Sequence, residues 1–293
     1  TINVQPAPGS TSPLTLGSLV NGALATPGDQ DRYTFTLTGS TQLYFDALTI
    51  NANLNWTLIG PAGPAVTGRS FNSSDSVNVG GNPVISVPAG DYTLTVDGTG
   101  DVTGAYAFRL SELSSAMPII PGTPFSGSLD PANETDLYRF TALAGERFYF
   151  DTQARTNGFP SVWRLVDPYG SILFFNFFTG ADVDVITLAQ PGAYTLLLEG
   201  AITDATPGAY TINVQPVAFS SQPMAFNEPV NASLSVPGEQ DDYTFTGATG
   251  QRVFFDRLGP AANITANLFA PSSNLVFSAA NNANFGPFFL PET

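Results

Sequence analysis

Acidic side chains recur in this sequence at three places, each just before a similar run of alternating residues. They are Asp29, Asp31, Glu134, Asp136, Glu239, Asp241 and Asp242. Later loops of the first two copies add Asp97 and Asp101 in one and Glu199 and Asp204 in the other. Calcium takes about six to eight oxygen ligands from carboxylates, carbonyls and water. The two loops together therefore form a candidate calcium site, and we expect no other cofactor.

The same carboxylates have a structural alternative. An acidic side chain beside a turn accepts hydrogen bonds from nearby backbone N–H groups and so caps the turn. No acidic segment of this chain matches a complete calcium-loop motif. We therefore favour turn capping and keep calcium as the second interpretation.

Catalysis is not expected of this chain. It contains no His and no Cys, which excludes Ser-His-Asp and Cys-His mechanisms and zinc sites built on those residues. Asp46, Asp151 and Asp256 recur after aromatic residues, and two carboxylates can hydrolyse a glycosidic bond. An active site is normally single, however, whereas a residue that recurs in every copy serves the fold. The sequence predicts a protein that is not an enzyme.

The elements that position these carboxylates repeat along the chain. The segments PGDQDRYTF, NETDLYRF and PGEQDDYTF place Tyr33, Tyr138 and Tyr243 105 residues apart. The aspartates that follow aromatic residues have the same spacing. Agreement of spacing, residue type and order indicates a tandem repeat.

Within each copy, apolar and hydroxyl side chains alternate, as in YTFTLT at residues 33–38. This period of two predicts strands with one buried face, and Gly and Pro punctuate them as in a β-sandwich. We predict an all-β fold of tandem jelly-roll-like β-sandwich modules of about 105 residues. The predicted parts are the last strand of a preceding module (1–6), module 1 (7–113), module 2 (114–217) and module 3 (218–293), which lacks its last two strands. Linkers are expected near 113–121 and 217–223.

The repeat resembles the bacterial pre-peptidase C-terminal domain family in three short motifs. The matching residues are Asp31, Tyr33, Phe35, Asp136, Tyr138, Phe140, Asp241, Tyr243 and Phe245 in the first motif, Pro168 and Gly170 in a turn, and Gly90, Tyr92, Leu94, Gly192, Tyr194 and Leu196 in the penultimate strand. The resemblance implies a jelly-roll-like sandwich that is exported from the cell, and relatives that bind calcium, collagen or polysaccharide. This chain departs from the family's usual setting because it carries no peptidase domain.

The charge balance limits the partners. The net charge is -15, and all nine basic residues are Arg. Nucleic acids and anionic lipids are bound by neutralising phosphates with Lys or Arg, so neither is an expected partner. No apolar run approaches the length of about 20 residues that a membrane span needs, so we expect no membrane insertion.

Two aromatic clusters are candidate interfaces. The first holds Phe174, Phe175, Phe177 and Phe178, and the second holds Phe285, Phe288 and Phe289. Successive residues of a strand point to opposite faces, so four Phe in one strand cannot all reach the same core. Either some of them form an exposed patch that joins modules, chains or a ligand, or a bulge folds all of them inward.

The ends of the sequence suggest a third candidate interface. TINVQP occurs at residues 1–6 and again at 211–216, in the last strand of the second copy. The favoured interpretation is that a longer array has been cut. The alternative is strand exchange, in which Thr1, Ile2, Asn3 and Val4 of one chain fill an edge left open in another.

These features lead to two functional hypotheses. The first is a structural or adhesive repeat segment of a large secreted or cell-surface protein or filament subunit, with copies of itself or neighbouring modules as partners. The second is an accessory module of a secreted hydrolase that binds extracellular polysaccharide or collagen. In the second case Trp56 and Trp163 are the candidates for stacking on a ligand, although their alignment in strands favours a core position.

Overall fold

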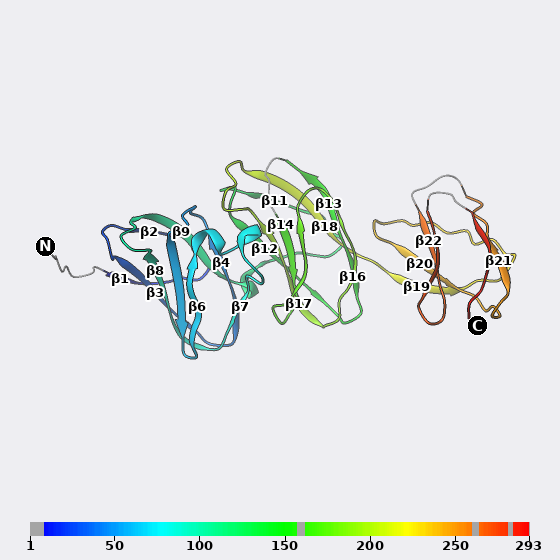
Figure 1. The fold of residues 1–293 in the computed structure, drawn as a ribbon, viewed down its shortest axis with the longest axis horizontal. Helices are drawn as coiled ribbons and strands as arrows, with labels where there is room; N and C mark the ends of the chain where they lie inside the picture. The colour runs from blue at the N-terminus through cyan, green and yellow to red at the C-terminus, as the bar shows by residue number, and fades with distance from the viewer. Residues whose placement is uncertain (1–8, 157–161, 260–263, 281–283, 293) are drawn as a thin grey trace. The chain divides into compact units, whose positions relative to one another are not determined.

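The computed structural model describes residues 9–156, 162–259, 264–280 and 284–292. The described residues form short strands and three short 3-10 helices (Figure 1), so the predicted all-β class of sandwich modules is confirmed. The chain divides into two compact units, Thr1–Val217 and Ala218–Thr293. The first unit contains two sandwiches, which we call modules 1 and 2, and the second unit contains module 3.

Module 1 is a sandwich of two sheets. One sheet has the order β1-β3-β8-β5-β6 and the other the order β2-β9-β4-β7. Its strands are β1 (Gly9–Pro13), β2 (Val20–Leu24), β3 (Gln30–Leu37), β4 (Thr41–Ala47), β5 (Leu54–Gly60), β6 (Gly63–Ser70), β7 (Ile85–Val87), β8 (Gly90–Gly98) and β9 (Gly104–Glu112). The 3-10 helices η1 (Phe71–Ser73) and η2 (Ser76–Asn78) lie between β6 and β7, and η3 (Leu113–Ser115) follows β9.

Module 2 repeats this topology, with the sheet orders β10-β12-β17-β14-β15 and β11-β18-β13-β16. Its strands are β10 (Met117–Pro118), β11 (Phe125–Leu129), β12 (Thr135–Ala142), β13 (Arg147–Arg155), β14 (Val162–Val166), β15 (Ile172–Phe177), β16 (Val183–Thr187), β17 (Gly192–Glu199) and β18 (Gly208–Pro216). Strand β12 begins 105 residues after β3, as the repeat predicts.

The cores of modules 1 and 2 form from the strand residues that point inward, which alternate with residues that point outward. In β3 every second residue is buried, and in β8 Tyr92, Leu94 and Val96 point into the same interior. Trp56 and Phe45 stack there, with ring centroids 4.0 Å apart. The apolar face of each sheet thus covers the other, and burial of these faces is the main stabilising contribution.

The described part of module 3 contains counterparts of six strands of module 1, namely β1, β3, β4, β5, β6 and β7. They are β19 (Phe219–Pro223), β20 (Gln240–Thr244), β21 (Arg252–Phe255), β22 (Thr265–Phe269), β23 (Leu275–Ala280) and β24 (Phe285–Phe289). In the described part of residues 218–292 these strands form three separate pairs, β19-β20, β21-β24 and β22-β23.

In the described part of module 3, β2, β8 and β9 of module 1 have no counterpart, and two of these three are central strands. In module 1, β8 lies between β3 and β5, and β9 lies between β2 and β4; β17 and β18 hold the same places in module 2. The last strands of a module are thus interior strands of its sheets. In the described part of module 3, β20 pairs only with β19 and β21 only with β24, so the edges that such strands cover in modules 1 and 2 have no partner strand. Filling of such an edge by another chain stays a prediction. Tyr243 and Phe255 are only partly buried, whereas Tyr138 and Phe150 at the same repeat positions are at most 5% exposed.

The two segments expected to be linkers are parts of the modules. Leu113 is buried, and Met117–Pro118 pairs with β12 as strand β10. Phe219–Pro223 is strand β19 and pairs in parallel with β20. Ser and Pro in these segments thus accompany short edge strands, where Pro is tolerated because its missing N–H faces away from the ladder.

Candidate functional site at the joint between modules

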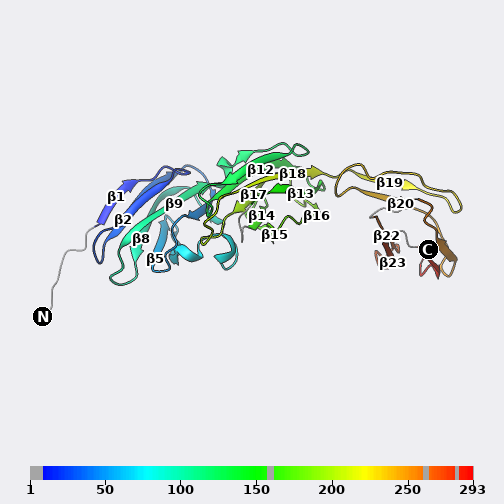
Figure 2. The same ribbon diagram turned by 90° about the horizontal axis from the view of Figure 1, so that it is seen from above.

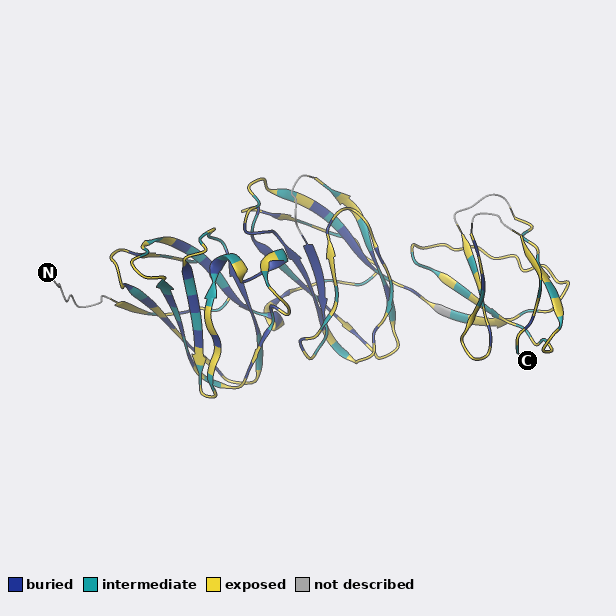
Figure 3. Ribbon diagram, in the orientation of Figure 1, coloured by how far each residue is buried: buried dark blue, intermediate teal, exposed yellow. Residues whose placement is uncertain are grey.

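Modules 1 and 2 meet at a joint that has its own apolar cluster. Tyr44, Leu113, Val166 and Leu197 are buried there, and Val84, Leu137 and Ile172 pack against them. Val166 and Leu197 belong to the five-stranded sheet of module 2 and point away from its core, toward module 1. Strand β14 is consequently buried along its whole length (Figure 3).

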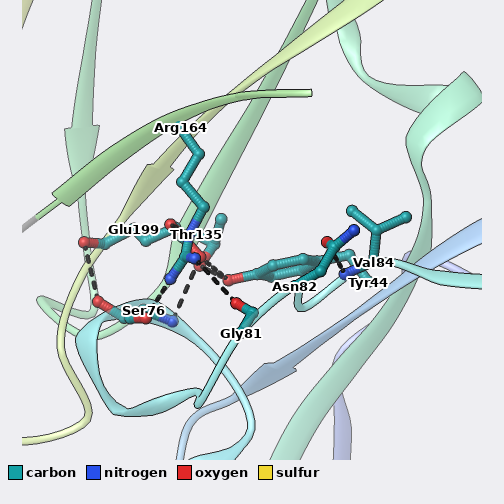
Figure 4. A network of polar contacts seen from close by, with 8 residues as sticks. All are labelled: Tyr44, Ser76, Gly81, Asn82, Val84, Thr135, Arg164 and Glu199. Atoms are coloured by element: carbon teal, nitrogen blue, oxygen red, sulfur yellow. Dashed lines mark hydrogen bonds and ion pairs between the residues drawn. The ribbon is translucent and has the colours of Figure 1, made fainter. Parts of the chain in front are cut away.

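A buried ion pair of module 2 lies beside this apolar cluster. Arg164 of β14 donates from Nε to Oε2 of Glu199 at 2.5 Å, and the two side chains are 4% and 0% exposed. The hydroxyl of Tyr44, from β4 of module 1, donates to Oε1 of Glu199 at 2.7 Å and lies 3.1 Å from the hydroxyl of Thr135. Figure 4 shows that side chains of both modules converge on the carboxylate of Glu199. A buried charge is tolerated when it is paired and its other polar atoms are hydrogen-bonded.

The segment around η2 supplies the remaining partners. The backbone N–H of Ser76 donates to Glu199 at 3.2 Å, and the backbone carbonyl of Ser76 accepts from Nη2 of Arg164. Nη1 of Arg164 donates to the carbonyl of Gly81 at 3.4 Å. Ser76 is fully buried and has a φ of 49°, a left-handed conformation that a residue with a side chain seldom adopts. Strain of this kind persists where the surroundings fix the backbone, and here the two ends of the ion pair do so.

A second ion cluster lies in the same joint. Arg109 of β9 donates to Glu134 at 2.9 Å and lies 3.5 Å from Asp46. Asp46 is 2% exposed, and its Oδ1 has no hydrogen-bond partner. Asp75 is 1% exposed and accepts from the N–H of Ala47 at 2.5 Å. Arg109, Asp46 and Asp75 belong to module 1, whereas Glu134 belongs to module 2.

Burial dominates the titration of these groups. Desolvation raises the pKa of Asp46 from 3.8 to about 7, although the nearby Arg109 lowers it. The pKa of Asp75 is raised well above its ordinary value, first by desolvation and then by the charge of Asp46. Desolvation also raises the pKa of Glu199, against the effects of Arg164 and Tyr44. Burial disfavours the ionised form of a carboxyl. The buried carboxyls of the joint therefore keep their protons to a higher pH than exposed carboxyls do.

The first set of predicted metal ligands caps turns. Asp29 accepts from the N–H of Ala25 at 2.9 Å, and Glu134 accepts from the N–H of Asp130 at 2.8 Å. Glu239 accepts from the N–H groups of Ser235 and Val236. Both the acid and the N–H that it caps recur every 105 residues, and this is the capping role that the sequence favoured.

The second acid of each motif belongs to a bridge between the two sheets. In module 1, Tyr106 of β9 donates to Asp31 at 2.6 Å, and its hydroxyl lies 2.7 Å from that of Tyr33. In module 2, Tyr210 donates to Asp136 at 2.5 Å and lies 2.7 Å from Tyr138.

Glycines on the neighbouring strands make room for these rings. A side chain at Gly22 would overlap the ring of Tyr106, and one at Gly127 would overlap the ring of Tyr210. In module 3, Tyr243 instead donates to its own neighbour Asp241 at 3.5 Å. The bridge therefore needs a strand of the β9 type as well as the repeated motif.

The other predicted ligands do not converge. Asp97 accepts from Gln30 at 2.8 Å, and Asp204 accepts from the N–H of Ala201 at 2.8 Å. Asp101 and Asp242 are exposed. Among the described residues no three acidic side chains form a group that could hold a metal ion. Calcium binding stays a prediction, and a chelator that left the melting temperature unchanged would contradict it.

The first aromatic cluster divides between core and surface. Phe174 and Phe178 pack on Trp163 with centroids 5.5 and 5.2 Å from its ring, whereas Phe175 and Phe177 are 40% and 52% exposed. The alternative in which all four rings fold inward is therefore wrong, because alternation along β15 sends Phe174 inward and Phe175 outward. That the exposed pair joins modules, chains or a ligand stays a prediction.

The second aromatic cluster gathers around Phe277. Phe285 and Phe288 lie 4.5 and 5.1 Å from its ring, and Phe289 is 66% exposed. The remaining predicted interface residues, Thr1, Ile2, Asn3 and Val4, lie outside the described residues.

Both tryptophans are core residues. Trp56 and Trp163 are 0% exposed, so neither can stack on a ligand, and their proposed role in ligand binding is wrong. Trp56 donates to the hydroxyl of Ser74 at 2.7 Å, and Trp163 is enclosed by phenylalanine rings. Their place in strands, which the sequence analysis noted, already pointed to the core.

Sequence reasoning missed most of the joint. Arg164, Tyr44 and Ser76 were not candidates, and Glu199 was a candidate for calcium instead of an ion pair. One signal was available: Arg164 stands in WRLV where the first copy has WTLI. A charge in a strand whose neighbours are all apolar suggests a buried partner.

Comparison with known proteins gives no assignment. No family model matches the chain, and no curated protein matches it in sequence. Solved structures show low similarity. PliG of Aeromonas hydrophila, a periplasmic inhibitor of g-type lysozyme, is 14% identical with a TM-score of 0.27, over 34% of this chain and 96% of that one. The pre-peptidase C-terminal domain of collagenase from Bacillus anthracis is 18% identical with a TM-score of 0.27, over 37% and 100%.

A third structure, the CUB1-EGF-CUB2 domains of rat MASP-1, is 9% identical with a TM-score of 0.23, over 69% of this chain and 99% of that one. At these scores the similarities carry no information on function. No helix among the described residues is long and apolar enough to cross a membrane.

Proposed function

We propose that this chain is a structural segment of an extracellular surface protein or filament, in which consecutive β-sandwich modules dock rigidly on one another. The observation that carries the proposal is the joint, where Arg164, Glu199 and Tyr44 form a fully buried network between modules 1 and 2. A flexible string of independent domains does not need such a network, because inter-domain contacts that allow motion are small and polar.

The composition supports the same role. The chain has no His or Cys and a net charge of -15, which suits a soluble scaffold that stays apart from other acidic surfaces. The bridges Asp31–Tyr106–Tyr33 and Asp136–Tyr210–Tyr138 tie together the two sheets of each sandwich. Such a sandwich is stabilised by burial and hydrogen bonds and has no disulfide, because the chain has no Cys.

Thermal unfolding tests the proposal. In the wild-type protein, modules 1 and 2 should unfold in one calorimetric transition, because neither can lose its structure without exposing the joint. Leu197→Asp should split this transition in two, since Leu197 points away from the core of module 2 and contacts only the joint. Thr95→Asp is the matched control at the same position of module 1. Separate transitions already in the wild type would contradict rigid docking.

Location and partners need their own tests. Antibody labelling of intact source cells should detect the chain at the surface, and exclusively intracellular labelling would contradict an extracellular role.

Binding to polysaccharide stays a prediction for a glycan array, now without its two candidate tryptophans. Strand exchange by Thr1–Val4 also stays a prediction. A variant without these residues should lose self-association if exchange occurs.

A further inference from the structure

The edge strand β15 of module 2 lacks the charges and prolines that normally protect a sheet edge, although its pairing with β14 has one register shift, between Leu165 and Val166. It is the outermost strand of its sheet, next to β14 (Figure 2). Its sequence, ILFFNF, contains no charge, no Pro and no Gly. Leu173, Phe175 and Phe177 are 40%, 40% and 52% exposed. Natural proteins protect exposed edges with charges, prolines or bulges because an unprotected apolar edge pairs with other strands.

Two other edges of the same unit have protective features. In module 1 the corresponding edge strand β6 contains Pro64 and Arg69, and Gly63 and Gly68 have positive φ values of 96° and 54°. Its pairing with β5 is interrupted by two register shifts. In module 2 the edge of the other sheet, β16, contains Asp184. Of the three edges β6, β15 and β16, β15 alone has neither a charge nor a Pro.

The position of β15 is also fixed by a contact with Arg164 of the neighbouring strand β14. The guanidinium of Arg164 lies 4.4 Å from the ring centroid of Phe175, and the same guanidinium is fixed by Glu199 and Ser76 in the joint. Phe175 and Phe177 lie 6.1 Å apart and present one apolar surface. A strand fixed in this way loses little conformational freedom on binding.

We propose that β15 is a self-association edge, where the strand pairs antiparallel with β15 of a second copy of this chain. A strand that meets itself across a two-fold axis is self-complementary, so apolar residues lie opposite apolar residues. Charge favours this place over others, because copies with a net charge of -15 repel one another. Residues 172–177 carry none of that charge. The contact also continues the apolar surface of the joint through Ile172.

The inference rests on the proposed structural role and names its partner. One pair of short strands buries less than the roughly 1,200 Å² of a typical stable interface. A single contact is therefore weak, and many modules in one array strengthen it by raising the effective concentration.

The test uses the full 293-residue chain in analytical ultracentrifugation over a concentration series. The wild type should dimerise reversibly. Phe177→Lys should weaken dimerisation at least about tenfold, because a charge would have to be desolvated in the new sheet. Thr67→Lys on the exposed part of β6 adds the same charge to the other module and should leave dimerisation unchanged. Thermal unfolding should show that both variants fold.

A cross-link identifies the strand directly. The chain has no cysteine, so Asn176→Cys introduces a single thiol near the C-terminal end of β15, and mild oxidation should give a covalent dimer. A monomer at all concentrations without cross-linking overturns the proposal, as does association that Phe177→Lys leaves unchanged. Glycan binding that Phe177→Lys abolishes in a monomeric protein also overturns it. A single cooperative transition for modules 1 and 2 would leave the proposed structural role intact in each case.

Discussion

The five-stranded sheets of modules 1 and 2 have the same strand order, but their outer faces differ in role. The outer face in module 1 is open, whereas the outer face in module 2 is covered by module 1. In module 1 this face has Thr57, Thr95 and Asp97, and it borders an open hollow of about 360 Å³. At the same positions module 2 has Arg164, Leu197 and Glu199, all buried against module 1. The inward residues keep their character, as with Trp56 and Trp163. The comparison teaches that the repeat conserves the core pattern within the chain, while docking depends on outward positions that the core does not constrain.

The largest effect should come from the buried carboxylate. Glu199→Ala should lower the free energy of unfolding by about 3–5 kcal/mol, because it leaves the charge of Arg164 buried without its partner. Asp97→Ala at the same position of module 1 should stay within about 0.5 kcal/mol. Urea unfolding measures both, and equal losses would remove the distinction between the two faces.

A purely apolar change comes next. Leu197→Ala should cost about 2–3 kcal/mol through lost burial and a cavity in the joint. Thr95→Ala should cost no more than about 0.5 kcal/mol, because Thr95 packs against no second module. If Leu197→Ala were neutral, the joint would not contribute to stability in solution.

The pH dependence of stability isolates the second ion cluster. Because the pKa of Asp46 is raised from 3.8 to about 7, the folded protein keeps a proton here that the unfolded chain releases above about pH 4. The contribution of Asp46 is fully present below pH 4 and is lost as the pH rises to about 7.

Asp46→Asn should flatten this fall in stability, while Asp151→Asn at the same position of module 2 should not. Arg109, Glu134, Asp75 and Glu199 surround Asp46. Because the charge of Asp46 raises the pKa of Asp75, the difference between the two variants measures Asp46 together with its effect on Asp75. A slope unchanged by Asp46→Asn would contradict the assignment.

The smallest effect concerns one hydroxyl. Tyr44→Phe should cost about 1–1.5 kcal/mol, because it removes the hydrogen bond to the buried Glu199. Tyr149→Phe at the same position of module 2 loses only an exposed bond to Asp182 and should cost less than about 0.5 kcal/mol. A larger loss for Tyr149→Phe would reverse the proposed order.

Much of the fold follows from local patterns. The alternation in residues 33–38 and the glycines before each later strand predict short strands with one buried face, and β3, β8, β12 and β17 follow that prediction. The turn-capping acids were also within reach, because Asp29 bonds a backbone group only four residues away. Interactions this close in sequence depend little on the rest of the fold.

The joint could not be derived in the same way. Tyr44 and Glu199 are 155 positions apart, and alternation does not show which outward face will be covered by another module. Likewise, only the strand order revealed that the last strands of a module are central, because sequence order does not give the order of strands in a sheet.

The sequence by itself determined the class of fold, the 105-residue repeat and the capping of its turns. These depend on side-chain alternation and backbone hydrogen bonds within a few residues. Only the tertiary structure decided that Arg164 and Glu199 are a buried pair, that Asp31 and Asp136 join two sheets, and that Phe175 and Phe177 face outward on a free edge. Those roles depend on long-range packing, which brings together residues that no local pattern relates.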